Sequence, residues 1–267
     1  VILFYEIGCF LQKKNYFFLA DIFFSIPYNF YKLFTFKNPD FEKTCFLYYS
    51  SKASIAKNYD RYFNKLKNEK LKILEIGIGG HSHSHLGGSS LRALKRYFKN
   101  CIILGIDLVD KKCHRRKKIK TLRGSQIDDI FLENIAKEYG PFDIIIDDGS
   151  HYVEHQLFSF NLLFKHLTNN GIYIIEDVHT SYKKSFGGST NISDENHLIN
   201  FFSNLAHNAY LQFIMPDEQK KLKTSINISS IQFFSDKQNS ILIEKSDVRK
   251  SVYENYFNLT KEELKKN

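Results

Sequence analysis

Several features that mark specialised classes of protein are missing from this chain of 267 residues. No apolar run reaches the roughly 18–20 residues that a transmembrane helix needs. The apolar run at positions 1–11 contains Glu6 and is followed by lysines, whereas a signal peptide places its positive charge first. The four cysteines show no CxxC spacing, and no internal repeat is visible. We expect a cytoplasmic globular protein without structural disulfides, and Val1 in place of Met leaves upstream sequence open.

The excess of positive charge is local. Lys and Arg number 38 against 29 Asp and Glu, and seven of the 38 lie in residues 111–120, which leaves 9 − 7 = +2 for the rest. An evenly basic nucleic-acid binder is therefore excluded. The basic run has two interpretations: a solvated turn, or a patch that attracts an anionic acceptor such as a nucleotide-linked or phosphorylated glycan.

Two apolar, β-branched runs end in acidic residues. The segment FDIIIDDGSH covers residues 142–151, and GIYIIEDVH covers residues 171–179. Asp148 and Glu176 are 176 − 148 = 28 residues apart, which is room for a helix and a return strand. Because ligands bind at the carboxyl ends of parallel strands, we expect Asp148, Glu176 and Asp177 to converge there. Three oxygen ligands predict a hard divalent cation, Mg²⁺ above all.

A second pattern precedes these runs. The strand-like KILEIGI at residues 72–78 leads into Gly77, Gly79 and Gly80, and a helix is expected from Ser89. CIILGID at residues 101–107 then ends in Asp107, which lies 30 residues after Gly77. A glycine-rich turn followed by an acid at the next strand end is typical of folds that bind a nucleoside by its ribose hydroxyls.

The flanking regions differ in composition. Residues 1–68 are rich in Phe and Tyr and predict an extension of short helices, interrupted by Pro27. It would be a cap on the main domain; the alternative is a lid or membrane-surface element. Residues 69–250 form the α/β domain, with a turn at 169–171, a long polar loop at 180–196, a helix near 195–208 and a terminal hairpin at 230–244. Residues 251–267 are a polar tail.

These segments together resemble the class I S-adenosylmethionine-dependent methyltransferases, and more narrowly the metal-dependent macrolide sugar O-methyltransferases of the mycinamicin and macrocin type. The resemblance rests on six segments in order: LEIGIGG, GGSSLR, GIDLVDK, EYGPFDIIIDDGSH, IIEDVHTSY and FGG, between residues 74 and 188. It implies a Rossmann-like sheet of seven strands, parallel except for an antiparallel terminal hairpin, with helices on both faces.

The resemblance also implies roles for individual residues. His151 would be the general base, and Asp148, Glu176 and Asp177 the metal ligands. The residues expected to bind S-adenosylmethionine are Glu75, Gly77, Gly79, Asp107, Gln126 and Asp147. The acid that the family carries after the third strand is Ser125 here, so adenine contacts would fall to Gln126 or Asp128. The family's His and Tyr ahead of the first strand have no clear counterpart near residues 51–59.

The implied activity is methyl transfer to a hydroxyl of a glycan, nucleotide sugar or glycosylated metabolite. The first alternative is a catechol-type O-methyltransferase with an aromatic acceptor. An RNA-binding module has only the basic run in its favour, and a non-catalytic fold disagrees with the retained acids and His151. For these acids the plain alternative is helix capping, and His81, His83 and His85 are expected in a solvated loop. We expect no nucleic-acid partner and no stable membrane insertion; a homo-oligomer stays open.

Overall fold

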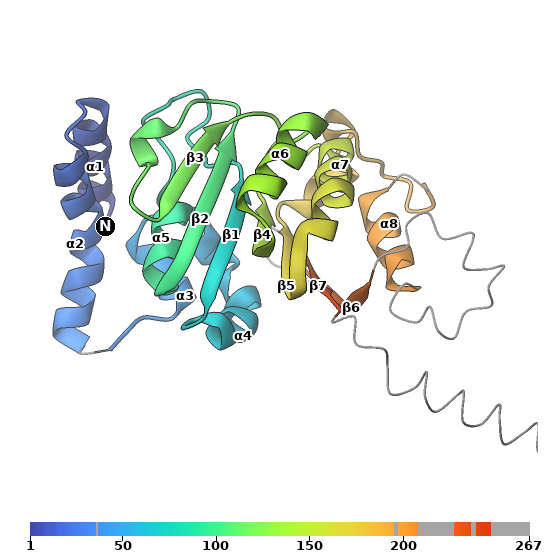
Figure 1. Cartoon of the computed structure of the whole chain (residues 1–267), viewed down its shortest axis with the longest axis horizontal. Coiled ribbons are helices and arrows are strands. Elements are labelled where there is room, and N and C mark those ends of the chain that lie inside the picture. The colour runs from blue at the N-terminus through green and yellow to red at the C-terminus, as the bar shows by residue number, and fades with distance from the viewer. Residues whose placement is uncertain (36, 195–196, 208–226, 236–238, 247–267) are drawn as a thin grey trace, which may run out of the picture.

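The computed structural model describes residues 1–35, 37–194, 197–207, 227–235 and 239–246. Its centre is a seven-stranded sheet of order β3-β2-β1-β4-β5-β7-β6 (Figure 1). Strands β1 to β5 pair in parallel, and β7 runs antiparallel to both β5 and β6. The predicted parallel sheet with an antiparallel terminal hairpin is therefore confirmed. The strands are β1 (Lys70–Ile76), β2 (Asn100–Asp107), β3 (Ile119–Arg123), β4 (Phe142–Asp147), β5 (Leu167–Ile175), β6 (Ile228–Phe234) and β7 (Ser240–Lys245).

Helices cover both faces of this sheet because neighbouring residues of its central strands point in opposite directions. In β1, Ile73 packs in one apolar core and Leu74 in the other. The first core contains residues of α3 (Phe41–Leu47), α4 (Ala56–Leu66) and α5 (Ser89–Tyr97). The second contains residues of α6 (Asp129–Tyr139), α7 (Val153–Leu163) and α8 (Leu198–Leu205). Burial on both faces explains why the strands read as continuous apolar runs.

The first two helices, α1 (Ile2–Lys13) and α2 (Phe17–Thr35), lie side by side at the β3 end of the molecule (Figure 1). The prediction that Pro27 interrupts the helix was wrong, because Pro27 lies inside α2. The buried rings on either side of it hold the helix in place. Phe24 lies 3.9 Å from the guanidinium carbon of Arg92, and Tyr28 lies 4.1 Å from that of Arg96. Tertiary packing thus overrides the local preference of proline.

Other boundaries moved for identifiable reasons. The turn predicted at residues 169–171 lies within β5, where Asn170 takes a left-handed φ of 60° and the pairing with β4 shifts register after Phe142. The polar loop at 180–194 begins with two short 3₁₀ turns, η4 (Val178–Tyr182) and η5 (Lys184–Phe186). Residues 236–238 of the hairpin, part of the predicted helix near 195–208, and the tail at 251–267 lie outside the described residues.

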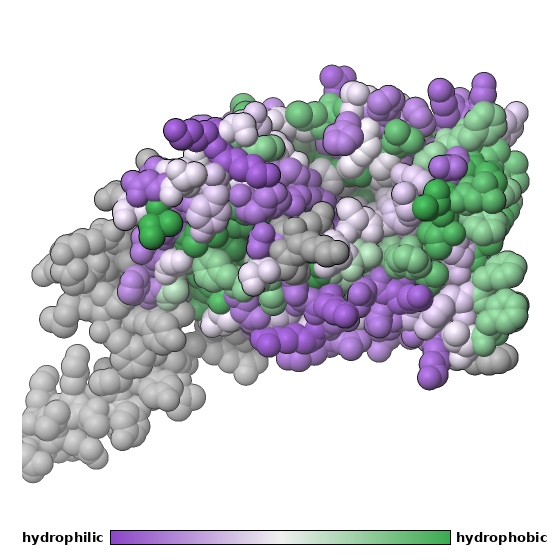
Figure 2. All heavy atoms as spheres, turned by 180° about the vertical axis from the view of Figure 1, so that it is seen from behind, coloured by the Kyte–Doolittle hydropathy of each residue, from purple (hydrophilic) through white to green (hydrophobic). Residues whose placement is uncertain are grey.

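Apolar side chains gather on the outer surface of the α1–α2 pair, seen at one end of the molecule in Figure 2. Phe18, Leu33 and Phe34 are exposed by 77%, 64% and 73%, which places them well outside the cores. Among the described residues, no helix has the length and apolar character needed to cross a membrane.

Candidate functional site

The ends of β1, β4 and β5 form one continuous edge. Ile76, Asp147 and Ile175 are aligned across these strands. The backbone hydrogen bonds continue one step further, because Asp148 N donates to Ile76 O at 2.9 Å and Glu176 N donates to Asp147 O at 2.9 Å. The acids predicted to converge therefore follow directly on neighbouring strands.

The glycine turn after β1 brings its backbone against the same edge. Gly77 has φ +84°, and a Cβ placed on it would lie 2.0 Å from Asp148 O. No other residue fits this position without moving the acid-bearing loop. Gly79 also has a left-handed φ of +76°, but a Cβ added there would have its nearest neighbouring atom 3.8 Å away. The backbone beside Gly79 therefore leaves room for the close approach of a bound group.

Asp107 lies at the end of β2 beside this turn. Its Oδ2 accepts a hydrogen bond from Ile78 N at 3.0 Å, and its Oδ1 accepts one from Val109 N at 2.8 Å. These two bonds fix the carboxylate, and each oxygen keeps a second lone pair that can accept from a ribose hydroxyl. The role of Asp107 in cofactor binding stays a prediction.

Gln126 connects the end of β3 to that of β4. Its Nε2 donates to Asp147 at 3.3 Å, and its Oε1 accepts from Ser150 N at 2.8 Å. Asp147 is fully buried and also accepts from the hydroxyl of Ser159, and burial raises its pKa to about 7 against these donors. Both side chains have internal partners, so their contact with the cofactor stays a prediction. Asp128 caps α6 by accepting from Phe131 N at 2.9 Å.

The acids at the edge fall into two groups. In the inner group, the ammonium of Lys52 lies 2.8 Å from Glu176 Oε1, 2.9 Å from Asp148 Oδ2 and 3.3 Å from Glu75 Oε1. Glu75 was predicted to bind the cofactor, and the structure places its carboxylate beside this ammonium. Burial alone would lower the pKa of Lys52. The three carboxylates raise it by more than burial lowers it, so the pKa of Lys52 lies well above its ordinary value. Lys52 is therefore charged.

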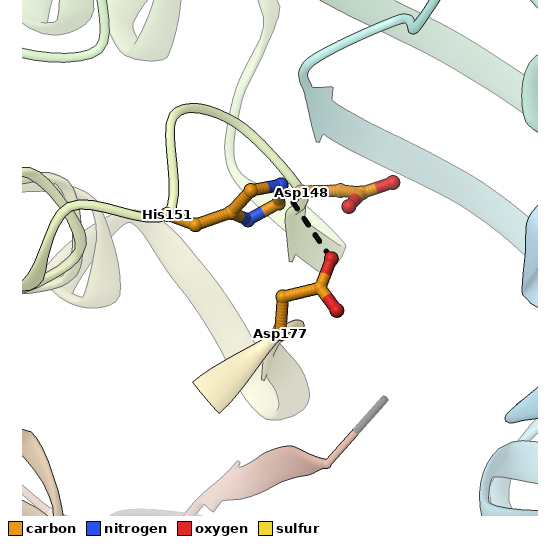
Figure 3. A group of neighbouring side chains, drawn as sticks. All are labelled: Asp148, His151 and Asp177. Atoms are coloured by element: carbon orange, nitrogen blue, oxygen red, sulfur yellow. Dashed lines mark ion pairs between the residues drawn. The ribbon is translucent and has the colours of Figure 1, made fainter. Parts of the chain in front are cut away.

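The outer group contains Asp148, His151 and Asp177, whose ligand atoms lie within 4.8 Å of one another (Figure 3). His151 Nε2 lies 3.5 Å from Asp177 Oδ2, and the three side chains are 19–25% exposed. Two of the three predicted metal ligands thus meet the predicted base. The third, Glu176, lies in the inner group, against Lys52.

Two residues of the outer group have unfavourable backbone conformations. His151 has φ 61° and Asp177 has φ 55°, both in the left-handed region. This conformation costs a residue with a Cβ on the order of 1–2 kcal/mol. Strain of this kind persists at functional sites, where the surrounding structure enforces it. Here Thr180 Oγ1 lies 2.8 Å from His151 O and 2.9 Å from Asp177 O, so one hydroxyl hydrogen is shared between the carbonyls of the two strained residues.

The charge balance of the edge fits a divalent cation. Of the four carboxylates Glu75, Asp148, Glu176 and Asp177, the first three contact the ammonium of Lys52, and Asp177 lies beside His151 and His179 instead. Burial raises the pKa of Glu176 to about 8, with Asp148 adding to the effect and Lys52 opposing it. Burial likewise raises the pKa of Glu75 and Asp177. Oxygen donors with uncompensated negative charge are what Mg²⁺ selects in proteins.

The basic run does not form a free patch at its start. Lys111 is buried, and its Nζ donates to Gly79 O, His83 O and Leu86 O at 2.6, 2.8 and 3.2 Å. Arg116 Nη2 donates to Asp21 at 2.6 Å. These two residues are bound internally, whereas Lys112, Arg115, Lys117 and Lys120 are exposed, as a solvated turn predicts. Attraction of an anionic acceptor by the run stays a prediction. His81 and His83 are exposed, as expected, and the described residues bring no metal group together there.

Lys52 is the residue of the edge that sequence reasoning missed. It lies in a single 3₁₀ turn, η1 (Ser51–Ser54), before the first strand. Its signal was its spacing, because Lys52, Ala56, Tyr59 and Phe63 follow one another at intervals of four, three and four and are all buried. A lysine in line with the apolar stripe of a helix requires a buried anionic partner. Tyr59 on this stripe also reaches Glu176 Oε1, at 3.5 Å.

Comparison with known proteins identifies relatives of this chain. Mycinamicin VI 2''-O-methyltransferase of Micromonospora griseorubida is 42% identical over 156 residues, or 57% of this chain and 39% of the relative. Demethylmacrocin O-methyltransferase of Streptomyces fradiae is 47% identical over 133 residues, or 50% of this chain and 34% of the relative. No family model matches the chain. The chain thus spans between a third and two fifths of the length of these curated relatives.

Solved structures agree. The MycE methyltransferase from the mycinamycin biosynthetic pathway, in complex with Mg, SAH and mycinamycin VI, superposes with a TM-score of 0.71 at 32% identity. The match covers 80% of this chain and 57% of MycE. A second crystal form with Mg and SAH gives a TM-score of 0.74 at 33% identity. In sequence and in fold, the chain is therefore similar to macrolide sugar O-methyltransferases, over only part of their length.

Proposed function

We propose that the chain transfers a methyl group from S-adenosylmethionine to a sugar hydroxyl of a glycosylated small molecule, with Mg²⁺ as a second cofactor. The observation that carries the proposal is the outer group, in which Asp148, Asp177 and His151 meet at neighbouring strand ends. The relatives support the same chemistry, since those named above are O-methyltransferases of mycinamicin VI and demethylmacrocin, and MycE binds Mg and SAH.

The residues divide the work between two adjoining places. The turn with Gly77 and Gly79 and the carboxylate of Asp107 would hold the nucleoside cofactor. Asp148, Glu176 and Asp177 would hold the cation, with Asp148 and Asp177 already in one cluster. When bound, the sulfonium cofactor supplies an electrophilic methyl group, and the cation lowers the pKa of the acceptor hydroxyl.

His151 has the position of the general base. Its ring lies beside Asp177 and is 25% exposed, so an acceptor hydroxyl can reach it. A neutral imidazole accepts a proton near pH 7, and the adjacent carboxylate stabilises the resulting imidazolium. His155, which lies four residues further on in α7, is engaged elsewhere, because its Nδ1 lies 2.7 Å from Ser150 Oγ. It therefore serves as the matched control for His151.

The experiment is a methyl-transfer screen with labelled cofactor. Neutral glycosides, nucleotide sugars and catechols are offered in parallel, each with chelator and with chelator followed by excess Mg²⁺. The proposal expects transfer to a sugar hydroxyl that chelator abolishes and Mg²⁺ restores. Transfer to catechols alone would establish the aromatic acceptor instead, and full activity in metal-free protein would refute the role of the acids as metal ligands.

Two finer points belong to the same proposal. An anionic acceptor would show as a preference for nucleotide sugars over neutral glycosides, although Lys111 and Arg116 of the basic run are bound internally. A homo-oligomer would show as a mass above 31.4 kDa in light scattering on the active sample.

A further inference from the structure

The ammonium of Lys52 lies among three carboxylates at the strand ends. It is 1% exposed and contacts carboxylates that follow or end three different strands, β1, β4 and β5. Such convergence is the arrangement by which proteins hold a cation rather than a surface ion pair. Neither the relatives' names nor the motifs of the sequence assign a role to this residue.

Packing holds Lys52 in this place. Its own N–H donates to Ser50 Oγ at 3.4 Å, and the stripe that continues through Tyr59 and Phe63 is fully buried. Phe63 packs edge-on against Phe41 and Phe98, with ring centroids 4.9 and 5.1 Å apart. The lysine is thus delivered by a rigid segment, and its ammonium cannot move into solvent without displacing that segment.

The contacts also leave donors free on the outer side. Lys52 contacts Oε1 of Glu176 and Oδ2 of Asp148, one oxygen of each carboxylate. Asp148 can still serve a divalent cation shared with Asp177, because the two belong to the outer group. Without the ammonium, Glu75 and Glu176 would be buried and uncompensated, which would create a second place with high affinity for a cation.

We propose that Lys52 permanently fills an inner cation position formed by Glu75, Asp148 and Glu176, and thereby limits this edge to one divalent ion on the side of Asp177. The proposal rests on the proposed metal site. Lys52 is a positioning residue: it sets the number and affinity of the ions that bind, and it does not touch the reacting atoms.

The test compares two substitutions that remove the same charge but leave different amounts of space. Lys52→Met fills the volume, whereas Lys52→Ala leaves it open. Manganese binding is measured by electron paramagnetic resonance and calorimetry, and thermal unfolding is followed in chelator and in excess Mg²⁺. Lys57→Met is the control, since Lys57 lies on the same segment but its side chain is 78% exposed.

The proposal predicts one manganese ion per chain in the wild type and in the control. Lys52→Met should still bind one ion, at least about tenfold more tightly because a repelling charge is gone. Lys52→Ala should bind a second ion. Both should unfold at a lower temperature in chelator and gain more from Mg²⁺ than the wild type does.

Contrary outcomes are distinct. Unchanged stoichiometry in Lys52→Ala, or weaker binding in Lys52→Met, would show that the lysine only supports the fold and would overturn the proposal. Should neither variant fold in chelator, Glu75→Gln combined with Lys52→Met removes an acid together with the ammonium. It should fold and bind one ion, and its failure to do so also overturns the proposal. A wild type that binds no manganese would instead refute the proposed function.

Discussion

The two halves of the strand edge are organised by different forces. On the half of β1, β2 and β3, the polar groups of Asp107 and Gln126 are satisfied by hydrogen bonds within the chain. On the half of β4 and β5, Asp148 and Glu176 contact the ammonium of Lys52 together with Glu75 of β1, and burial raises the pKa of Glu176 and Asp177.

The difference indicates how each half is completed. A hydrogen-bonded loop is already in its binding geometry, so a ligand adds contacts without reorganising it. A cluster with excess negative charge is costly until a cation joins it. Changes to the first half should therefore act mainly on cofactor affinity, and changes to the second half on metal affinity and turnover.

The largest effect, a loss of turnover, is expected for His151→Ala in the half of β4 and β5. Loss of the general base should lower turnover by about 10²–10⁴-fold, while calorimetry shows little change in cofactor affinity. In His155→Ala, turnover should stay near normal. A collapse of turnover in His155→Ala but not in His151→Ala would mean that the base is misassigned.

Gly77→Ala should disturb both halves of the strand edge, because the glycine turn after β1 contacts the loop after β4. The added Cβ would lie 2.0 Å from Asp148 O and would require a left-handed φ. Overpacking and backbone strain together predict a loss of about 2–5 kcal/mol in the free energy of unfolding. Gly79→Ala has the same left-handed φ but open space around the Cβ. Chemical denaturation of the two variants separates the cost of overpacking from the cost of the left-handed backbone. Equal losses in the free energy of unfolding would contradict the close contact between the added Cβ and Asp148 O.

Asp107→Ala should affect the cofactor half alone. Loss of a charge-assisted hydrogen bond to ribose predicts a weakening of about 1.5–3 kcal/mol, or roughly 10–150-fold in Kd. Asp110→Ala is the control, because Asp110 lies on the same loop and pairs with Lys112 at 2.9 Å. Calorimetry should show unchanged manganese affinity in both. If the folded Asp107→Ala protein binds S-adenosylmethionine as tightly as the wild type, Asp107 does not contact the cofactor.

A smaller, pH-dependent effect is expected beneath the glycine turn. His114 Nε2 lies 3.1 Å from Leu86 O, and Nδ1 lies 2.9 Å from Gln12 Nε2 and 3.2 Å from Arg92 Nη1. A carbonyl only accepts, so Nε2 carries the hydrogen and Nδ1 accepts. Burial lowers the pKa of His114 to about 3, and the charges of Arg92, Lys111 and Arg116 add to this.

The sign follows from linkage. Between pH 6.5, the ordinary pKa of histidine, and pH 3, the unfolded chain binds a proton at His114 that the folded chain does not. The free energy of unfolding is therefore unaffected by His114 above pH 6.5. Within the window it decreases by up to about 1.4 kcal/mol for each unit by which the pH falls. Thermal unfolding of wild type and His114→Gln between pH 7 and 5 measures the difference, and parallel curves would contradict it.

The sequence was informative where local pattern determines structure. The β-branched runs ending in Asp148 and Glu176 had to become buried strands, and parallel neighbours had to bring their ends together. The sheet, its hairpin and the meeting of Asp148, His151 and Asp177 could therefore be predicted.

What could not be predicted depends on contacts distant in sequence. Lys52 lies 96 residues from Asp148 and 124 from Glu176, in a 3₁₀ turn, and its local spacing indicates a buried anionic partner but not which acids provide it. Likewise, Pro27 stays within a helix because Arg92 and Arg96 hold the rings beside it. In both cases, tertiary packing decided the outcome.

The left-handed backbone at His151 and Asp177 has a consequence for directed evolution of this chain. Glycine or asparagine adopts that conformation more easily than either residue does. Asparagine in place of Asp177 would also remove an under-compensated charge. A library selected for heat resistance alone should therefore enrich glycine and asparagine at these two positions and lose turnover as it gains stability. Selection for activity must keep both strained residues, and extra stability must then come from elsewhere in the chain.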